Sequence, residues 1–420
     1  MAESLGISRG TVTAAYAELR ADGRLGSRLG SGSRVRPTLG RPAADRARVY
    51  GRLATVAEHD STFDLTSGAL PALPSTAEIA ERAVRERLPR LLAGSGYDPQ
   101  GLPELRAGVS AYYGQLGAQT APAEVAITTG SQQALGLLAD AFVAPGDTVL
   151  VEDPTYRGAI EIFHSRGARL VPIPVLGDGP DPEALRLLVR RLRPRVVYML
   201  PIAHNPTGYV VTPARARAIA AVLADSEAMF FEDGTPADLV LDRSRPPTPV
   251  GVGIPPERWI SIGSVSKLYW GGLRVGWIRA SAGVIERMTR IKTNADQGTS
   301  LVSQAITIDC LQNVEEARSV RRGQLLGSLG DAELLLHELA PEWSWQRPQG
   351  GSALWVEIPN ADARALAEIG LRHGVAVVPG AFFSAIDGFA DRLRIPFWGS
   401  AEELRDGLEL LVGTWRGQAR

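Results

Sequence analysis

A lysine between serines and an arginine is the first candidate for chemistry in this sequence. Only two of the 45 basic residues are lysines, Lys267 and Lys292. Because the arginine guanidinium stays protonated in proteins, any step that needs a neutral amine must use one of these two. Lys267 lies in SIGSVSKLYWGGLRVGW, where Ser264 and Ser266 precede it and Arg274 follows. These residue types could form a Schiff base through the lysine and bind a phosphate through the others.

Four further motifs place polar or aromatic side chains in loops. In TTGSQQAL, Gly130 and Ser131 open a helix, and the N–H groups and dipole at a helix N-terminus favour a phosphate. In EDPTYRG, Tyr156 could stack on a planar ring. In PIAHNPTG, Asn205 could donate its amide to a ring oxygen. In FFEDGTPADL, Asp233 ends an apolar run, and a carboxylate there could hold a protonated pyridine nitrogen.

The elements that must position these motifs follow from an alternation of short apolar runs and helical stretches after Phe63. It predicts an α/β fold with a mostly parallel sheet, helices on both faces, and ligands beyond the carboxyl ends of the strands. A long helical stretch over Leu301–Leu339 and shorter segments after it predict a second, smaller lobe. The predicted strands are Val125–Thr128, Thr148–Val151, Arg169–Ile173, Val196–Leu200, Ala228–Phe231, Trp259–Ile262 and Val275–Arg279. Helices are predicted over Ser131–Val143, Asp181–Arg193 and Pro213–Asp225.

In this order the five motifs resemble those of a fold-type I, aspartate-aminotransferase-like domain that binds pyridoxal 5′-phosphate. The resemblance covers residues 63–420 and implies a seven-stranded, mostly parallel sheet in a large domain of about residues 95–300, with the small lobe formed by the flanking segments. It implies that Lys267 is the catalytic residue and forms the internal aldimine. It also implies that Asp233 binds the pyridine nitrogen and that Asn205 binds the phenolic oxygen.

The same resemblance implies roles for the remaining site residues. Tyr156 stacks on the ring, and Tyr97 in GYDPQGLPELR reaches the phosphate of the neighbouring subunit of a homodimer. Arg394 in DRLRIPFW holds a substrate carboxylate. Thr235 stands where many members have a tyrosine that bonds the phenolic oxygen, which bears on transamination and not on cofactor binding. The phosphate is held by Gly130, Ser131, Gln132, Ser264, Ser266 and Arg274.

The N-terminal end differs in charge from the rest of the chain. Residues 1–52 carry ten arginines and four acids, an excess of +6, whereas residues 53–420 have an excess of −7. The first segment predicts a helix over Arg9–Ala21 with Ser8 as its N-cap. Its outer N-terminal face is where a recognition helix contacts the DNA major groove. The following GRLGSRLGSGSRVRP predicts a two-stranded hairpin, a basic wing along phosphates that carries Arg24, Arg28, Arg34 and Arg36.

Residues 1–36 resemble the second half of a GntR-type winged helix-turn-helix, and residues 37–62 are interpreted as a linker. The family's first helix would precede Met1, so either the true start lies upstream or the DNA-binding unit is incomplete. The alternative interpretation is a solvated arginine-rich arm without a partner. The resemblance implies DNA contacts from Ser8, Arg9, Thr11, Thr13, Arg28 and Arg34.

Together the two parts resemble a MocR-type regulator. This implies a homodimer that binds DNA and senses pyridoxal phosphate or an amino compound through an aldimine at Lys267. The alternatives are an aminotransferase that acts on an amino acid or related amine and retains a vestigial DNA-binding arm, or a pyridoxal-phosphate lyase.

The remaining composition narrows the class of protein. One cysteine, Cys310, excludes a disulfide framework and a multi-cysteine metal site. No apolar run reaches the roughly 18 residues of a membrane span, so we expect a soluble, cytoplasmic protein without a membrane partner or a metal. Lys292 has no motif like that of Lys267 and is interpreted as a surface or helix-end residue. His164 and His204 are interpreted as structural.

Overall fold

The computed structural model divides the chain into two units, which are described separately below. Their boundaries are Met1–Arg52 and Leu53–Arg420. The structure describes residues 8, 25–27, 33–35 and 63–418.

In the first unit, the described residues form the hairpin that the sequence predicts. Strand β1 (Leu25–Ser27) pairs antiparallel with β2 (Ser33–Val35), which includes Arg34. Ser8 is exposed. The predicted helix over Arg9–Ala21 and the linker at residues 37–62 lie outside the described residues.

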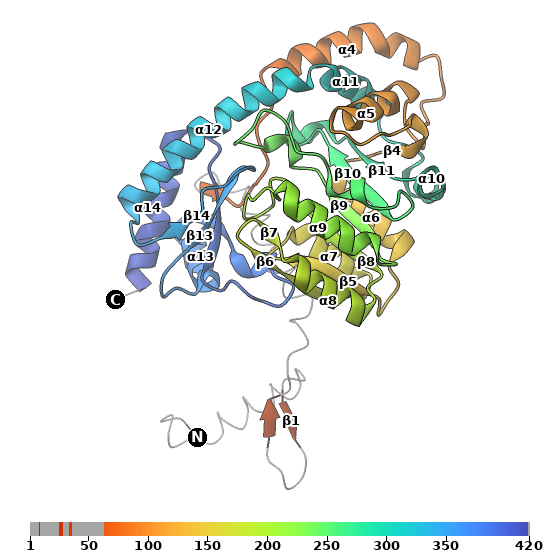
Figure 1. Cartoon of the computed structure of the whole chain (residues 1–420). Helices are drawn as coiled ribbons and strands as arrows, with labels where there is room; N and C mark the ends of the chain where they lie inside the picture. The colour runs from red at the N-terminus through yellow and green to blue at the C-terminus, as the bar shows by residue number, and fades with distance from the viewer. Residues whose placement is uncertain (1–7, 9–24, 28–32, 36–62, 419–420) are drawn as a thin grey trace. The chain divides into compact units, whose positions relative to one another are not determined.

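The second unit contains an eight-stranded sheet in the order β4-β11-β10-β9-β8-β5-β6-β7 (Figure 1). All seven predicted strands are present, and a two-residue strand, β7, adds an eighth. Strand β11 is antiparallel to β10 and β4, β7 is antiparallel to β6, and the other pairs are parallel. The strands are β4 Val125–Thr128, β5 Thr148–Asp153, β6 Arg169–Leu176, β7 Gly179–Pro180, β8 Val196–Met199, β9 Met229–Asp233, β10 Trp259–Ser264 and β11 Gly276–Arg279.

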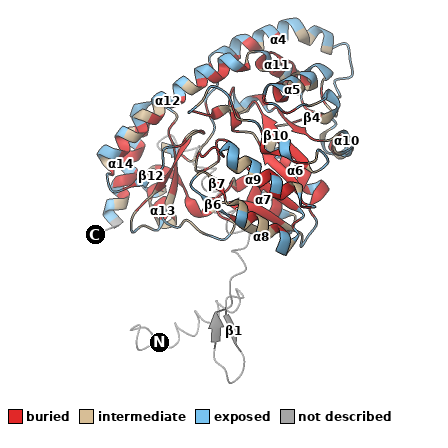
Figure 2. Ribbon diagram, in the orientation of Figure 1, coloured by how far each residue is buried: buried red, intermediate tan, exposed pale blue. Residues whose placement is uncertain are grey.

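Helices cover both faces of this sheet because successive strand residues point to opposite sides. Phe230 belongs to the core under α5, α8 and α9, and Phe231 to the core under α6, α7 and α10. Figure 2 shows the strands buried and the helices exposed on their outer sides. The helices are α5 Pro103–Gln115, α6 Ser131–Phe142, α7 Arg157–Ser165, α8 Pro182–Leu192, α9 Pro213–Ala224 and α10 Ala282–Asp296.

The helical stretch predicted over Leu301–Leu339 is two helices that meet at Asn313. Helix α11 (Leu301–Gln312) packs on α4 (Ser75–Leu91), and α12 (Val314–Leu339) begins in the core of the large lobe and ends in that of the small lobe. One continuous helix therefore belongs to both lobes (Figure 1).

The small lobe is built on a five-stranded sheet in the order β12-β13-β15-β14-β3. Strand β3 comes from the start of the unit and pairs parallel with β14, whereas the other pairs are antiparallel. Helices α12, α13 (Ala363–Arg372) and α14 (Ala401–Gln418) share its core. The strands are β3 Phe63–Leu65, β12 Ser344–Trp345, β13 Ala353–Glu357, β14 Val375–Pro379 and β15 Arg392–Pro396.

None of the helices in the described part of the chain has the length and apolar character that crossing a bilayer requires.

Candidate active site

The residues predicted to bind a cofactor lie where the parallel strands of the large sheet end. Gly130 and Ser131 follow β4, Tyr156 follows β5, and Asn205 follows β8. Asp233 is the last residue of β9, and Ser264 is the last residue of β10. Because these ends share one edge of the sheet, residues far apart in sequence meet at one site.

The turn between β4 and α6 leaves room for backbone only. Gly130 has a φ of 81°, which favours glycine, and a Cβ built on it would lie 2.9 Å from Nη2 of Arg274. A Cβ on Gly276 would lie 2.8 Å from the backbone nitrogen of Ser131. The first N–H groups of α6 have no partners within the helix, so this crowded turn presents them to an anion beside a guanidinium.

Side chains around this turn are held by hydrogen bonds. Tyr156 is the N-cap residue directly before α7, and its hydroxyl donates to Oε1 of Gln132 over 2.9 Å. The hydroxyls of Ser264 and Ser266 lie 2.7 Å apart, and Ser264 also donates to the carbonyl of Val275. Hydrogen bonds within the protein therefore hold these four predicted residues in place.

Asp233 is a buried carboxylate with a tyrosine beside it. Tyr198, on the neighbouring strand β8, donates its hydroxyl to Oδ2 of Asp233 over 2.8 Å, and the N–H of Thr235 donates to Oδ1 over 2.9 Å. Burial raises the pKa of Asp233, although the hydrogen bonds from Thr235 and Tyr198 act in the opposite direction. Among the described residues no cation forms an ion pair with Asp233, so a ligand cation would stabilise its charge there.

Lys267 is partly buried and has a weakened affinity for protons. Burial, and then the positive charge of Arg394, lower the pKa of Lys267 to about 8, while Asp233 acts in the opposite direction. The Nζ atom of Lys267 donates to the carbonyl of Gly68 over 2.9 Å, and Arg394 donates to the carbonyl of Thr66. An amine with this pKa is available in its neutral form near physiological pH, as a nucleophile must be.

Two predicted residues have a less enclosed setting. Asn205 is half-buried in the turn after β8, and Gly208 closes that turn with a φ of 74°. Tyr97 is 68% exposed and lies before α5. Its predicted role in the site of a second subunit stays a prediction.

The predicted DNA contacts fall largely outside the described residues. Ser8 is exposed and Arg34 lies in β2. Arg9, Thr11, Thr13 and Arg28 are not among the described residues.

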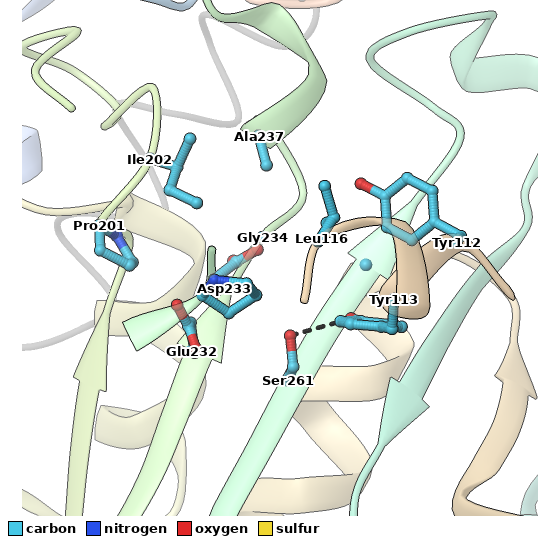
Figure 3. Close-up of a pocket in the computed structure, with 12 residues that line it drawn as sticks. Tyr112, Tyr113, Leu116, Pro201, Ile202, Glu232, Asp233, Gly234, Ala237 and Ser261 are labelled. Atoms are coloured by element: carbon cyan, nitrogen blue, oxygen red, sulfur yellow. Dashed lines mark hydrogen bonds between the residues drawn. The ribbon is translucent and has the colours of Figure 1, made fainter. Parts of the chain in front are cut away.

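A small cavity lies against Asp233 and Gly234 (Figure 3). On its other side, the Tyr113 hydroxyl and the Ser261 hydroxyl form a 2.9 Å hydrogen bond. Its volume of about 20 Å³ is enough for about one water molecule and far too small for an amino acid.

Lys292 was expected to be a surface or a helix-end residue; it does lie in the last turns of α10, and the surface alternative is wrong. Its side chain is 1% exposed and its Nζ atom lies 2.7 Å from Oδ1 of Asp296. Sequence reasoning also missed Tyr198, whose signal was available: it is the one polar side chain in a strand that is otherwise aliphatic, VVYM. A hydroxyl in a fully buried strand needs a hydrogen-bond partner, and Asp233 is that partner.

These residues fit pyridoxal phosphate on the chemistry of each group. The Gly130 turn, which a Cβ would fill, suits a phosphate, and Asp233 suits a protonated ring nitrogen. Lys267 offers the neutral amine that an aldehyde requires, and Tyr156 offers an aromatic face. All of these groups lie at one edge of the sheet.

Comparison with known proteins agrees with this fit. Residues 62–411 match the family described as aminotransferase class I and II. The chain is 34% identical to the 2-aminoadipate transaminase of Thermus thermophilus, over 79% of this chain and 84% of that protein. It is 29% identical to the uncharacterized HTH-type transcriptional regulator YdfD of Bacillus subtilis, over 97% of this chain and 89% of that protein.

A solved structure with the same fold is the α-aminoadipate aminotransferase LysN from Thermus thermophilus, complexed with N-(5′-phosphopyridoxyl)-L-leucine. The TM-score is 0.78 at 30% identity, over 89% of this chain and 99% of that one.

Fold and site together define a pyridoxal-phosphate protein of fold type I. The chain belongs to the class I and II aminotransferase family, and its cofactor is pyridoxal phosphate. Its relatives include both aminotransferases and proteins named as HTH-type transcriptional regulators.

Proposed function

We propose that the chain is a MocR-type transcriptional regulator, in which the cofactor domain controls DNA binding by the N-terminal unit. The observation that carries this proposal is the extent of the similarity to YdfD. It covers 97% of the chain and so includes most of the residues before position 62, where the family match begins. An aminotransferase does not need the GntR-like motif of residues 1–36.

Within the cofactor domain, we assign each residue the role that its setting supports. Bound pyridoxal phosphate supplies an aldehyde that condenses with amines and a ring that withdraws electrons. Lys267 provides the amine that holds it, Asp233 keeps a proton on the ring nitrogen, and Asn205 donates to the phenolic oxygen. Arg394 orients the carboxylate of an amino compound.

Control of DNA binding requires two states of a homodimer that bind the amino compound with different affinity. Arg394 is the cation that the carboxylate of such a compound would engage, and it donates to the carbonyl of Thr66, next to the Gly68 carbonyl that Lys267 contacts. Engagement of Arg394 by a ligand would compete with its hydrogen bond to Thr66, which directly follows β3 near the start of the domain.

The direct test is binding of the whole chain to DNA from upstream of its own gene, measured by fluorescence anisotropy at several salt concentrations. Each arginine–phosphate contact contributes about −0.9 to the slope of log K against log salt. Replacing Arg28 and Arg34 with glutamine should therefore make the slope less negative by about 2. Arg290→Gln, an exposed arginine of α10, serves as the matched control and should leave it unchanged.

Absence of salt-dependent binding, or an equal effect of the control, would contradict the regulator proposal. The addition of pyridoxal phosphate should change the DNA affinity of the wild-type chain and not that of Lys267→Ala.

A second function, transamination, is favoured by the 34% identity to a 2-aminoadipate transaminase. In this case Lys267 also moves a proton between the substrate Cα and the cofactor. To test this, the protein loaded with cofactor is mixed with L-2-aminoadipate. Two signals are followed: the loss of the visible absorption of lysine-bound cofactor and the formation of 2-oxoadipate. A loss of the visible absorption in proportion to the protein, without repeated formation of 2-oxoadipate, would favour a sensor over an enzyme.

A further inference from the structure

Lys292, the second lysine of the chain, has no part in the cofactor chemistry described above. It lies one helical turn before the end of α10, and its side chain is 1% exposed. A buried ammonium is costly unless it is paired and hydrogen-bonded. Its partner is Asp296, whose side chain is 24% exposed and whose Oδ1 atom lies 2.7 Å from Nζ. The role of the pair depends on what else the Asp296 carboxylate binds.

Asp296 connects this pair to helix α6. Its Oδ2 atom accepts a hydrogen bond of 2.6 Å from Nε2 of Gln133, and Oε1 of Gln133 accepts one of 2.7 Å from the backbone N–H of Thr129. The amide of Gln133 can adopt only one orientation here, because the carboxylate needs a donor and the backbone N–H needs an acceptor. Three consecutive hydrogen bonds thus join the ammonium to Thr129.

Thr129 is the residue from which the chain enters the phosphate-binding turn. Its N–H is bound by Gln133, and its carbonyl accepts a hydrogen bond of 3.1 Å from Nη2 of Arg274. Both polar backbone groups of Thr129 are therefore fixed. This fixes the direction in which Gly130 and Ser131 present their N–H groups.

A second branch of the cluster leads to the segment around Tyr97. Oδ1 of Asp296 also accepts a hydrogen bond of 2.9 Å from the N–H of Gly298. A Cβ on Gly298 would lie 2.7 Å from the carbonyl oxygen of Asp98, so the two backbones are in close contact. Asp98 directly follows Tyr97, the side chain expected to reach the phosphate in a second subunit.

We propose that Lys292 is a positioning residue for the phosphate of the cofactor. It does not touch the phosphate; it acts through Asp296 and Gln133 on the Thr129 peptide, and through Gly298 on the Tyr97 segment. One buried charge thereby orders the phosphate-binding groups of its own subunit and the segment offered to the partner. The proposal requires the phosphate to bind at Gly130 and Ser131, and it is independent of DNA binding.

The test compares two ligands that differ only in the phosphate. Cofactor-free whole chain is titrated with pyridoxal phosphate and with pyridoxal, and both dissociation constants are measured from the visible absorption. Lys292→Met keeps the length of the side chain and removes the charge. Its dissociation constant for pyridoxal phosphate should rise about tenfold, the value of roughly one hydrogen bond to a charged group, while that for pyridoxal stays unchanged.

Two further variants separate positioning from folding. Gln133→Met breaks the connection at its other end and leaves the ion pair intact, so it should show the same phosphate-specific loss even where Lys292→Met fails to fold. Arg290→Met is the matched control, because Arg290 pairs with Glu286 at 2.6 Å on the exposed face of the same helix. It should change neither constant.

The proposal would be overturned if Lys292→Met and Gln133→Met weakened the binding of pyridoxal phosphate and of pyridoxal equally, or left the ratio of the two dissociation constants unchanged. A wild-type chain that does not prefer pyridoxal phosphate to pyridoxal would overturn the phosphate assignment and this inference with it. The test of DNA binding would remain valid after either result, since it does not use the dissociation constants of pyridoxal phosphate and pyridoxal.

Discussion

At the scale of single residues, the site is governed by charges that burial makes costly. Lys267 and Asp233 face the same space, and burial shifts both toward their neutral forms. A ligand with an aldehyde for the amine of Lys267 and a basic nitrogen for the carboxylate of Asp233 offsets the free-energy cost of burying both groups. The preference of this site for pyridoxal phosphate follows from that pairing and from the phosphate turn.

The first prediction concerns the pH dependence of Lys267. Only the neutral amine condenses with an aldehyde, so uptake of pyridoxal phosphate by the cofactor-free chain should accelerate as pH rises, with a midpoint at about 8. Arg394→Met removes a positive neighbour and should move the midpoint upward, toward the ordinary value of 10.5. Stopped-flow absorbance across pH measures it. A wild-type midpoint near 10.5 would contradict the expectation, and Arg290→Met should leave the profile unchanged.

The second prediction concerns Tyr198. Tyr198→Phe removes the hydrogen bond to Asp233 and should raise the pKa of that carboxyl further, since a donor to the charged form is lost. We expect about tenfold weaker binding of pyridoxal phosphate and a shift in the pH dependence of its visible band. Tyr113→Phe is the control, because it also removes a buried tyrosine hydrogen bond, to Ser261. The same spectral shift in both variants would refute a specific role for Tyr198.

At the scale of elements, strands were predictable where local composition decides them. Seven of the eight strands of the large sheet are short apolar runs, mostly buried in all of them except β6, and the loops after them carry the site motifs. Strand β7 is a Gly-Pro pair without any such pattern, and β3 pairs with β14, about 310 residues further along the chain. Strand pairings of this kind depend on tertiary contacts, which cannot be identified from a short stretch of sequence.

The same limit explains which site residues could be predicted. Lys267, Asp233 and Asn205 lie in motifs of their own, so the sequence places them without knowledge of the fold. The burial of Lys292 was not predicted, because its helix is predominantly polar and the burial results from packing against α6. Its partner Asp296 lies four residues further along the same helix, so the spacing of the pair is visible in the sequence and its burial is not.

The third prediction belongs to the turn between β4 and α6. Gly130→Ala places a Cβ at a φ of 81° and 2.9 Å from Arg274, so it should cost roughly 1–2 kcal/mol of stability and weaken cofactor binding. Gly136→Ala, within α6 and with no atom beyond the neighbouring backbone of its own helix within 4 Å of its Cβ, should instead stabilise by about 0.5–1 kcal/mol. Thermal unfolding and cofactor titration measure both. Similar effects of the two substitutions would contradict the proposed crowding.

At the scale of the whole cofactor domain, the loop that carries Tyr156 also joins the two lobes. The N–H of Thr155 donates to the carbonyl of Phe383 over 2.8 Å, and Asp153 accepts a hydrogen bond of 2.9 Å from the N–H of Ala385. Arg394, from the small lobe, lowers the pKa of Lys267 in the large lobe. Movement of the small lobe would thus change the pKa of Lys267. A ligand bound at Arg394 could therefore affect the residue that holds the cofactor.

The last prediction tests whether the functional unit is a dimer with shared sites. If Tyr97 serves the partner's phosphate, Tyr97→Phe impairs the site of the other subunit, whereas Lys267→Ala disables its own. In a hybrid of the two variants, one site combines an intact Lys267 with an intact Tyr97. Each variant alone should bind pyridoxal phosphate weakly or without the visible band, and mixing them under subunit exchange should restore tight binding to about half of the sites in each hybrid. Recovery is specific to shared sites, because two defects confined to their own subunits cannot compensate each other; an unchanged titration after verified exchange would place Tyr97 outside the partner's site.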